Sequence, residues 1–360
     1  MACRVVFVGP DKSPSLLYGE CSVPSIYSGQ ILAKIKLATI CDSDLTAVSA
    51  NAVPSVLGHE AVAEVLENQR SDCPLVPGDR IIFSAFDICG ACGRCRLGIP
   101  QKCSKLLKYG HRNLSQASGF TGCFASHIVL EKGTTICKVP LHISDPVACV
   151  INCPVATMVN AVSSIPQNCR KALVQGAGLL GLFGCVLLKE RGFLNVYVTD
   201  VNEARLQHVS KFGGLAFNLN GSSQTSRVSS DAPCGKIHRN APKEETMDVV
   251  IEVSGGPGVL SQGLRYLRPG GMYVFVDTRH SQLDLQFPVD VLMRKMFTMQ
   301  GVLGYQPCHL EEAVDFVSRT TSQYPYDSLF GPEFSLSSFH EAVGIAKEKK
   351  FHRVIVRPPQ

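Results

Sequence analysis

The chain lacks both a recognisable secretory signal and an apolar run long enough to cross a membrane. Its most membrane-like stretch, Ala172–Leu188, is uncharged over seventeen residues but falls short of the ~20 residues that span a bilayer, and it contains Gln175 and four glycines. The amino-terminal run MACRVVFVGPDKSPS is apolar only briefly and breaks at Gly9-Pro10, whereas a signal peptide needs a longer apolar core. The carboxy-terminal Pro-Pro-Gln carries no targeting address. We therefore expect a cytoplasmic protein without a membrane partner.

Charge is also scarce. Charged residues make up 18% of the 360 positions, and the formal net charge of +5 is too small to suggest a nucleic-acid partner. The length allows two domains, each with its own core. Basic residues do gather in one segment, either as a solvated face around a metal site or as an attractor for an anionic substrate. These residues are Arg94, Arg96, Lys102, Lys105, Lys108 and Arg112.

Cysteine, in contrast, is abundant. Sixteen cysteines without an export signal indicate a reducing compartment in which some thiols bind metal rather than form disulfides. Four of them follow the spacing Cys89-x-x-Cys92-x-x-Cys95, closed by Cys103. Four thiolates at this spacing enclose one tetrahedral Zn²⁺ and leave no coordination position for a substrate. The motif predicts a structural zinc site.

The hydrophobic pattern changes near residue 150. The first part contains short β segments separated by Gly, Pro and Ser, as in a β-barrel-like domain. The second part alternates strands and helices, which predicts a parallel sheet with helices on both faces. The segment 220–245, rich in Ser, Asn, Pro and charge, is expected to form an exposed loop. The expected αβ elements are Lys171–Gln175, Leu179–Glu190, Asn195–Asp200, Glu203–Phe212, Asp248–Val253, Leu260–Leu267 and Met272–Asp277, followed by a helix at His309–Thr320 and a terminal strand.

A dinucleotide-binding turn follows the first expected strand of the αβ part. In Gly176-Ala-Gly178-Leu179-Leu180-Gly181, the first glycine permits a tight turn and the second permits close approach of a pyrophosphate. The third glycine lets the helix pack on the strand. Leu179 and Leu180 open that helix, whose free N–H groups and positive dipole end suit phosphate.

The choice of nucleotide depends on Asp200, nineteen residues after the last glycine of this turn. A carboxylate at the end of the second strand can accept both hydroxyls of an adenosine ribose and would repel a 2′-phosphate. NAD is therefore favoured over NADP. Arg205 is the nearby residue that could weaken this preference.

Three more residues, Cys41, His59 and Cys153, are far apart in the sequence, and each alone is more often a packed core residue than a ligand. Together with the four-cysteine motif, however, they complete a pattern that resembles the zinc-containing medium-chain alcohol dehydrogenase family. The resemblance covers nearly the whole chain. It is carried by CxSD at 41–44, GHE at 58–60, PGDR at 77–80, the cysteines at 89–103, GCFASH at 122–127, CPVAT at 153–157, GAGLLG at 176–181 and Asp200.

The resemblance implies an α/β protein with two domains. Residues 1–152 and 296–360 would form a GroES-like β-barrel catalytic domain, with a structural zinc lobe at about 88–105. Residues 153–295 would form a Rossmann domain, a doubly wound parallel sheet that binds NAD. Cofactor and substrate would meet in the cleft. The family also implies two zinc ions per chain and a homodimer or homotetramer.

Site roles follow by the same resemblance. Cys41, His59 and Cys153 match the ligands of a catalytic zinc with one open position for water or substrate. Glu60 matches a carboxylate that can approach the metal transiently. Asp44 matches a residue that orients a ligand.

Two residues match the family's proton-transfer and nicotinamide positions. Ser43 would take the proton of the alcohol and pass it to the nicotinamide ribose, and Thr157 would pack against the nicotinamide ring. Many members have histidine where this chain has Thr46, so the outer step of the proton relay is in question because threonine does not titrate near neutral pH. Ala63 replaces a glycine that usually follows the GHE motif.

The predicted reaction is hydride transfer between an alcohol, or its aldehyde or ketone, and NAD. A polyol dehydrogenase, a threonine-type amino-alcohol dehydrogenase and a non-catalytic dehydrogenase-like scaffold are the alternatives. The run GAGLLGL and the tail FPVDVLMRKMFTMQGVLGYQPCHLEEAV also resemble the phosphonate-catabolism-associated branch of the family.

Overall fold

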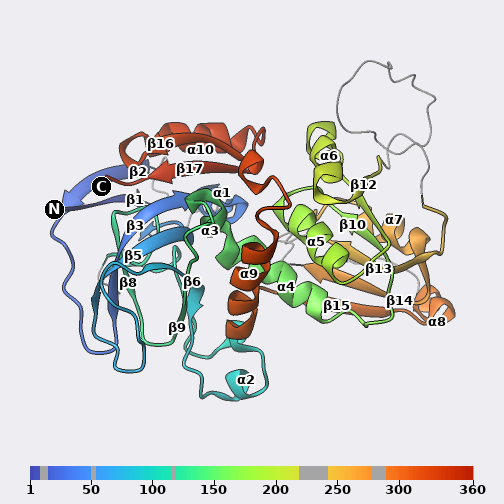
Figure 1. Ribbon diagram of the computed structural model, residues 1–360, viewed down its shortest axis with the longest axis horizontal. Helices are drawn as coiled ribbons and strands as arrows, with labels where there is room; N and C mark the ends of the chain where they lie inside the picture. Colours follow the sequence, from blue (N-terminus) through green and yellow to red (C-terminus); the bar gives the residue numbers. More distant parts are fainter. Residues whose placement is uncertain (9–14, 50–53, 115–118, 219–241, 277–288, 360) are drawn as a thin grey trace. The chain divides into compact units, whose positions relative to one another are not determined.

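Figure 1 shows the computed structural model, which describes residues 1–8, 15–49, 54–114, 119–218, 242–276 and 289–359. The chain forms two compact units. One consists of Met1–Cys153 with Gln306–Gln360, and the other consists of Pro154–Tyr305. The chain therefore passes from one unit to the other twice.

The first unit is built on a curled, mixed sheet. Its strand order is β16-β17-β3-β5-β6-β7, with β8 also pairing with β3 and β9 with β6. Only β16 and β17 pair in parallel among the described strands of this sheet. The strands are β3 (Ile31–Thr39), β5 (Glu60–Asn68), β6 (Arg80–Asp87), β7 (Leu107–Lys108), β8 (His127–Leu130), β9 (Thr134–Lys138), β16 (Phe330–Ser335) and β17 (Arg353–Arg357).

Alternation along β3 explains how this sheet covers its core. Lys34 and Lys36 are half-buried, whereas the aliphatic residues between and around them are buried. Buried side chains of β3 pack into a core that also contains Phe83, Phe124 and Phe339. A second sheet, β2 (Ser15–Cys21), β1 (Ala2–Val8) and β4 (Ser55–Val56), adjoins this body.

The second unit contains a parallel sheet with the order β12-β11-β10-β13-β14-β15. The order reverses next to β10, which is the arrangement of a doubly wound dinucleotide-binding fold. Helices α4 and α5 lie on one side of the sheet, and α7 and α8 on the other (Figure 1). The elements are β10 (Lys171–Gln175), α5 (Leu179–Glu190), β11 (Asn195–Thr199), α6 (Glu203–Val209), β12 (Leu215–Ala216), β13 (Met247–Glu252), α7 (Val259–Tyr266), β14 (Leu267–Val276), α8 (Val289–Lys295) and β15 (Thr298–Val302).

The predicted fold class is confirmed in both units, and the sequence also missed several elements. The missed helices include α1 (Asp42–Ser49), α3 (Asp145–Val150), α4 (Ala156–Ser163), α8 and α10 (Phe339–Lys347), and the missed strands include β2 and β7. The remaining helices of the first unit are α2 (Gly93–Arg96) and α9 (Pro307–Thr320). Most of the loop predicted at 220–245 lies outside the described residues.

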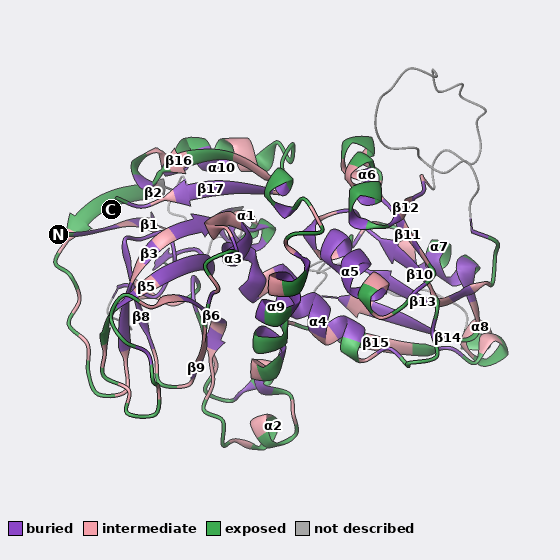
Figure 2. Cartoon of the chain, viewed as in Figure 1, coloured by how far each residue is buried: buried purple, intermediate pink, exposed green. Residues whose placement is uncertain are grey.

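One helical stretch, Asp145–Ser163, is long and apolar enough by composition to cross a membrane. However, 78% of its apolar window is buried inside the protein. Figure 2 shows that the residues of the sheets are largely buried, whereas those around α2 are exposed or half-buried. The stretch is therefore explained as a core helix.

Candidate functional site

Four potential metal ligands meet in the first unit. The donor atoms of Cys41, His59, Glu60 and Cys153 all lie within 4.8 Å of one another. Cys41 directly precedes α1, His59 directly precedes β5, and Cys153 lies in the helical turn Ile151–Val155. The structure thus brings together the three residues that the sequence predicted as ligands of a catalytic zinc.

The strand register explains why two of these residues converge. β3 and β5 are antiparallel, and Thr39 lies opposite Glu60 in their register. Cys41 therefore leaves one strand at the same edge of the sheet at which His59 enters the other. This register is why Cys41 and His59, 18 positions apart in the sequence, become neighbours in the fold.

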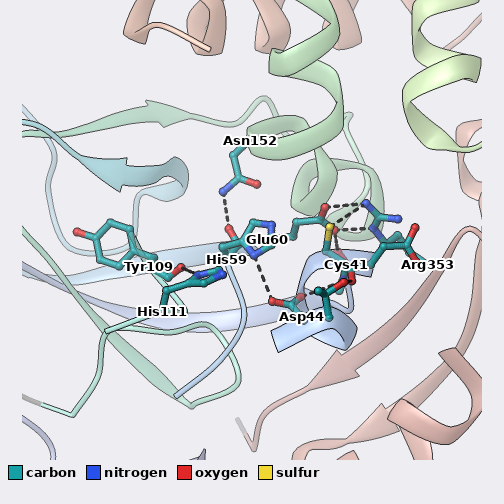
Figure 3. A network of polar contacts seen from close by, with 11 residues as sticks. Cys41, Asp44, His59, Glu60, Tyr109, His111, Asn152 and Arg353 are labelled. Atoms are coloured by element: carbon teal, nitrogen blue, oxygen red, sulfur yellow. Dashed lines mark hydrogen bonds and ion pairs between the residues drawn. The ribbon is translucent and has the colours of Figure 1, made fainter. Parts of the chain in front are cut away.

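A buried amide secures the third segment. Asn152 donates through Nδ2 to the carbonyl oxygen of His59 at 2.8 Å and to that of Phe83 at 2.7 Å. Figure 3 shows this amide pointing toward His59. Because Asn152 precedes Cys153, these two bonds tie the turn that carries the cysteine to the two strands of the site.

Asp44 contacts two of the predicted ligands at once. One carboxylate oxygen accepts the backbone N–H of Cys41 at 2.9 Å, and the other lies 3.3 Å from Nδ1 of His59 (Figure 3). Burial opposes protonation of His59, but Asp44 and then Cys41 raise its pKa well above the ordinary value. A carboxylate beside one imidazole nitrogen fixes the ring so that the other nitrogen can bind a metal.

The thiols of buried Cys41 and half-buried Cys153 share a proton when no cation is bound. The pKa of Cys41 is lowered to about 6, mainly because Cys153 donates to its sulfur, and Arg353 and His59 favour the thiolate further. The pKa of Cys153 is raised well above its ordinary value by this same bond and by burial. A divalent cation can replace the shared proton, so this donor set fits zinc with two thiolates and one imidazole.

Glu60 forms a buried ion pair with Arg353. Arg353 donates to both of its carboxylate oxygens, at 2.8 and 2.9 Å, and Thr39 donates to one of them at 2.7 Å. Burial raises the pKa of Glu60, but Arg353 outweighs it and the pKa falls to about 2. Arg353 also places Nη2 3.4 Å from Sγ of Cys41 (Figure 3). The structure therefore engages Glu60 in an ion pair, and its approach to a metal stays a prediction.

Ser43 and Thr46 lie on α1, in different environments. Ser43 is 5% exposed, and its hydroxyl has no hydrogen-bond partner among the described residues. A buried polar atom of this kind normally has a partner, which a bound substrate could supply. Thr46 is exposed and donates to the carbonyl of Asp42 at 3.0 Å, within its own helix. The structure shows no contact between the two hydroxyls.

The four cysteines of the predicted structural site also converge. Their sulfurs lie within 4.8 Å of one another, and the separations include 3.4 Å for Cys89–Cys103, 3.5 Å for Cys92–Cys95 and 3.9 Å for Cys92–Cys103. Sulfurs about 2.3 Å from a tetrahedral zinc lie about 3.8 Å apart, so the cluster fits this ion. None of the residues of α2, which carries Cys95, is buried. The lobe thus has little apolar core of its own.

Protonation within this cluster is uneven. Backbone N–H groups, led by that of Ser104, lower the pKa of Cys92 to about 5, whereas desolvation and the neighbouring sulfurs raise that of Cys95 to about 12. Thiolates and thiols therefore coexist when no cation is bound. Zinc binding would displace the remaining protons, which makes its affinity pH-dependent.

The glycine turn of the second unit has the geometry that its motif predicts. Gly176 has φ of +118°, and a Cβ on Gly181 would lie 1.8 Å from the carbonyl oxygen of Gly176. Gly178 caps α5 without a side-chain hydrogen bond, and none of the described residues lies within 4 Å of where its Cβ would be. Leu179 and Leu180 begin α5. The helix start can therefore accept a phosphate group.

Asp200 is joined to this turn directly. Its Oδ2 accepts the backbone N–H of Ala177 at 2.8 Å, and its Oδ1 accepts that of Asn202 at 2.8 Å. Asn202 caps α6 and accepts from the backbone of Arg205. Thr157 is buried in α4 of the same unit. The carboxylate that would select the nucleotide therefore also orients the turn that would bind its phosphates.

Two known domain families match the chain. Residues 27–141 match the alcohol dehydrogenase GroES-like domain, and residues 180–319 match the zinc-binding dehydrogenase domain. Together the matches cover more than two thirds of the sequence. The chain belongs to the zinc-containing medium-chain alcohol dehydrogenase family. It is an oxidoreductase of this family and uses a nicotinamide cofactor.

Individual relatives agree with this assignment. L-threonine 3-dehydrogenase of Streptomyces coelicolor is 29% identical over 311 residues, which cover 82% of this chain and 83% of that protein. The crystal structure of an alcohol dehydrogenase from Thermotoga maritima matches with a TM-score of 0.87 and 26% identity and covers 100% of both chains. Alcohol dehydrogenase from Thermus sp. ATN1 matches with a TM-score of 0.81 and 22% identity over 99% of this chain and 100% of that chain, so it shows the fold alone.

Three residues escaped prediction from the sequence, two in the metal site and one at the dinucleotide turn. Arg353 lies in the tail, 293 residues from Glu60, and no local motif marks it. Asn152 directly precedes the CPVAT motif but is not part of it. Asn202 could have been found, because Asn directly before Glu203 at a helix start is a typical capping pattern.

Proposed function

We propose that the chain transfers hydride between an alcohol, or its carbonyl counterpart, and NAD, with a catalytic zinc held by Cys41, His59 and Cys153. The observation that carries this proposal is the convergence of these three residues, which nothing local in the sequence explains. The second zinc, bound by the four-cysteine lobe, is structural. The unit Met1–Cys153 with Gln306–Gln360 would carry the metal chemistry, and Pro154–Tyr305 would carry the dinucleotide.

The protein residues would act by holding, orienting and moving protons. Bound zinc supplies Lewis-acid polarisation of the substrate oxygen. Bound NAD supplies the hydride acceptor. Asp44 keeps the His59 ring in its ligating orientation, and Arg353 adds to the stabilisation of the Cys41 thiolate. The hydroxyl of Ser43, buried and without a protein partner, accepts the proton of the substrate hydroxyl and passes its own proton outward.

NAD rather than NADP is the proposed cofactor because of Asp200. Its carboxylate is fixed by the N–H groups of Ala177 and Asn202, so it cannot swing away from a ribose without breaking both bonds. A 2′-phosphate would meet this fixed negative charge. Arg205 lies close to Asp200 in the sequence, in the first turn of α6, and is the residue that could weaken the preference for NAD. It is therefore the residue to change if NADP proves to bind.

A threonine-type amino alcohol is the second candidate substrate. The support is the similarity to L-threonine 3-dehydrogenases, 29% identical in Streptomyces coelicolor and 24% in Coxiella burnetii, where the match covers 96% of both chains. Both substrate classes contain a carbinol that the same metal and cofactor would oxidise. They differ in whether the pocket must also recognise an ammonium and a carboxylate.

We also propose that the protein is a cytoplasmic homodimer or homotetramer, as the family resemblance implies. Light scattering coupled to size-exclusion chromatography measures this state directly.

The test of function is a spectrophotometric screen with a metal count. Zinc-loaded protein should contain two zinc ions per chain and form NADH, absorbing at 340 nm, with simple alcohols, polyols, L-threonine or hydroxy-phosphonates. His59→Ala should keep one zinc and its affinity for NADH, but should lose about a thousandfold or more in kcat. Full activity of His59→Ala with only the lobe zinc present would refute the catalytic-zinc proposal.

A further inference from the structure

A second imidazole lies beside the one that belongs to the metal site. The rings of His59 and His111 have centroids 6.4 Å apart and planes tilted by 50°. Figure 3 shows the two side chains next to each other. His59 is 6% exposed, whereas His111, which follows β7, is exposed. An accessible imidazole therefore lies next to a proposed zinc ligand, and no step of the proposed mechanism uses it.

Close packing of two glycines places the histidines side by side. Each histidine directly follows a glycine, Gly58 for His59 and Gly110 for the other. A Cβ on Gly110 would lie 2.7 Å from the carbonyl oxygen of Gly58. Gly110 has φ of +79°, and its backbone N–H donates to the carbonyl oxygen of Thr121 at 2.7 Å. No larger residue fits at this position without a shift, so the approach of the two backbones is built into the fold.

The residue before this second glycine anchors the segment in the core. Tyr109 is 0% exposed, and its backbone N–H donates to the carbonyl oxygen of Ala85 in β6 at 3.1 Å. Its hydroxyl oxygen accepts the backbone N–H of Glu131 at 2.9 Å and lies 2.7 Å from the hydroxyl of Thr134. All of these residues belong to the first unit. The fold of this unit alone therefore sets the position from which His111 extends.

The ring of His111 makes a hydrogen bond that defines its chemistry. Its Nδ1 lies 3.1 Å from the carbonyl oxygen of Tyr109 (Figure 3). A carbonyl oxygen can only accept, so Nδ1 carries the proton and donates. In a neutral ring the lone pair then lies on Nε2, which accepts hydrogen bonds from groups such as a hydroxyl or an ammonium.

The distance between the two rings matches the size of a small substrate. Zinc lies about 2 Å from a ligating histidine nitrogen, and a substrate oxygen in its open position lies at a similar distance. A polar group on the carbon next to the metal-bound carbinol therefore extends over the same range as the 6.4 Å between the ring centroids.

We propose that His111 is a specificity-determining residue that accepts, through Nε2, a hydrogen bond from a hydroxyl or ammonium group next to the substrate carbinol. The substrate class is then a vicinal diol or a vicinal amino alcohol, because a simple alcohol lacks the group that the ring would bind. The inference rests on the proposed function in one respect, namely that the metal held by Cys41, His59 and Cys153 binds the carbinol.

The first experiment compares kcat/KM for 2-butanol, 2,3-butanediol and 3-amino-2-butanol in wild type and in His111→Phe. These substrates share a carbon skeleton and differ only in the group beside the carbinol. Wild type should prefer the diol or the amino alcohol about tenfold over 2-butanol, which is the size expected for one hydrogen bond. In His111→Phe this preference should fall to near one, mainly through a higher KM, because the contact forms before hydride transfer and persists during it. The larger of the two ratios in wild type identifies which donor the site takes.

Two further variants separate the hydrogen bond from the bulk of the side chain. His111→Gln should keep part of the preference, because its amide oxygen can accept near the position of Nε2. The matched control is His142→Phe, since His142 is an exposed histidine of the same unit with Nε2 3.2 Å from the carbonyl oxygen of Ser318. This control should keep the wild-type preference. If His111→Phe fails to fold, His111→Leu replaces it.

A second readout needs no turnover. Nitrogen-15 NMR of zinc-loaded protein without NAD reports which ring nitrogen of His111 carries the proton, and the resonances are assigned by their absence in the variant. Nδ1 should be protonated, and the Nε2 resonance should shift on addition of 2,3-butanediol or 3-amino-2-butanol but not of 2-butanol. A proton on Nε2 instead, or an unchanged substrate preference in His111→Phe, would overturn the inference alone. Failure of zinc-loaded wild type to oxidise any of the three substrates would count against the proposed function as well.

Discussion

Replacing Arg353 by methionine is the most informative single change in the metal site. Methionine keeps much of the length of the side chain but removes the charge and every donor. It would leave Glu60 buried with Thr39 as its remaining partner and would remove the guanidinium beside Cys41. Glu60 is 0% exposed and Arg353 is 9% exposed, so water cannot replace the lost partner.

The expected size follows from the carboxylate. Burial raises the pKa of Glu60, but Arg353, with His59 and Thr39, outweighs it and the pKa falls from 4.5 to about 2; at about 1.4 kcal/mol per unit this corresponds to roughly 3–4 kcal/mol. Removing one partner of a buried ion pair typically costs roughly 3–5 kcal/mol, so the two magnitudes agree. At neutral pH the ionised Glu60 should therefore stabilise the first unit by about 3 kcal/mol relative to the same carboxylate in the unfolded chain, and loss of Arg353 should remove at least this much.

The pH dependence has a definite sign. Because the pKa is lower in the folded protein, the stabilisation is fully present above pH 4.5 and disappears as the pH falls from 4.5 toward 2. The difference in stability between wild type and Arg353→Met should accordingly be large at pH 7 and should shrink across that interval.

Hydrogen exchange of peptides from β3 and β17 is the suitable assay, because a two-unit chain need not unfold in one step and the sequence contains no tryptophan for fluorescence. A loss of 3 kcal/mol should accelerate exchange through unit opening about a hundredfold. Arg357→Met is the matched control, since Arg357 lies on the same strand and pairs with Glu333, but both side chains are more than a third exposed. That pair should contribute at most about 1 kcal/mol. Equal effects of the two changes would refute the reasoning.

Three further predictions concern the other parts of the site. Cys95→Ser should release one equivalent of zinc and lower the thermal midpoint, measured by metal analysis and circular dichroism; two retained zincs and an unchanged midpoint would rule out a closed structural site. Asp200→Ala should raise KM for NAD⁺ about tenfold and narrow the gap to NADP⁺ in steady-state kinetics, because it removes the ribose acceptor and the support of the Ala177 N–H; a wild-type preference for NADP⁺ would contradict the assignment. Ser43→Ala should lower kcat by about 10²-fold with zinc content unchanged and a shifted pH–rate profile, and an unaltered profile would place the proton path elsewhere.

The sequence was sufficient for the features that depend on short spacing. Cys89, Cys92 and Cys95 lie within one loop, so their convergence needs only a local turn. The glycine turn is similar, because Gly176 and Gly181 act within a single strand-to-helix connection. The change from β segments to strand–helix alternation gave the fold class, since periodicity survives without knowledge of tertiary contacts.

Features that depend on strand register were not accessible in this way. α1 escaped prediction because its sequence, DSDLTAVS, has little apolar periodicity, and its start is fixed by Asp44 and the Cys41 backbone. No sequence motif marks the contact of Gln306 with the carbonyl of Gly98, because the two residues are 208 positions apart. Convergence of Cys41 with Cys153 was inferred from family resemblance, and no spacing rule connects two residues so far apart.

The position of Arg353 has a consequence for how the metal site is completed. This residue arrives on β17, which pairs with β3 close to Cys41, although the two residues are 312 positions apart in sequence. Until β17 docks, Glu60 lacks its guanidinium partner, and a buried carboxylate next to two thiols would repel the negative charge that they need as ligands. Docking of the tail neutralises Glu60 and favours the thiolate of Cys41 in the same step. High-affinity zinc binding at this site should therefore require the folded carboxy-terminal strand, even though all three proposed ligands precede residue 154.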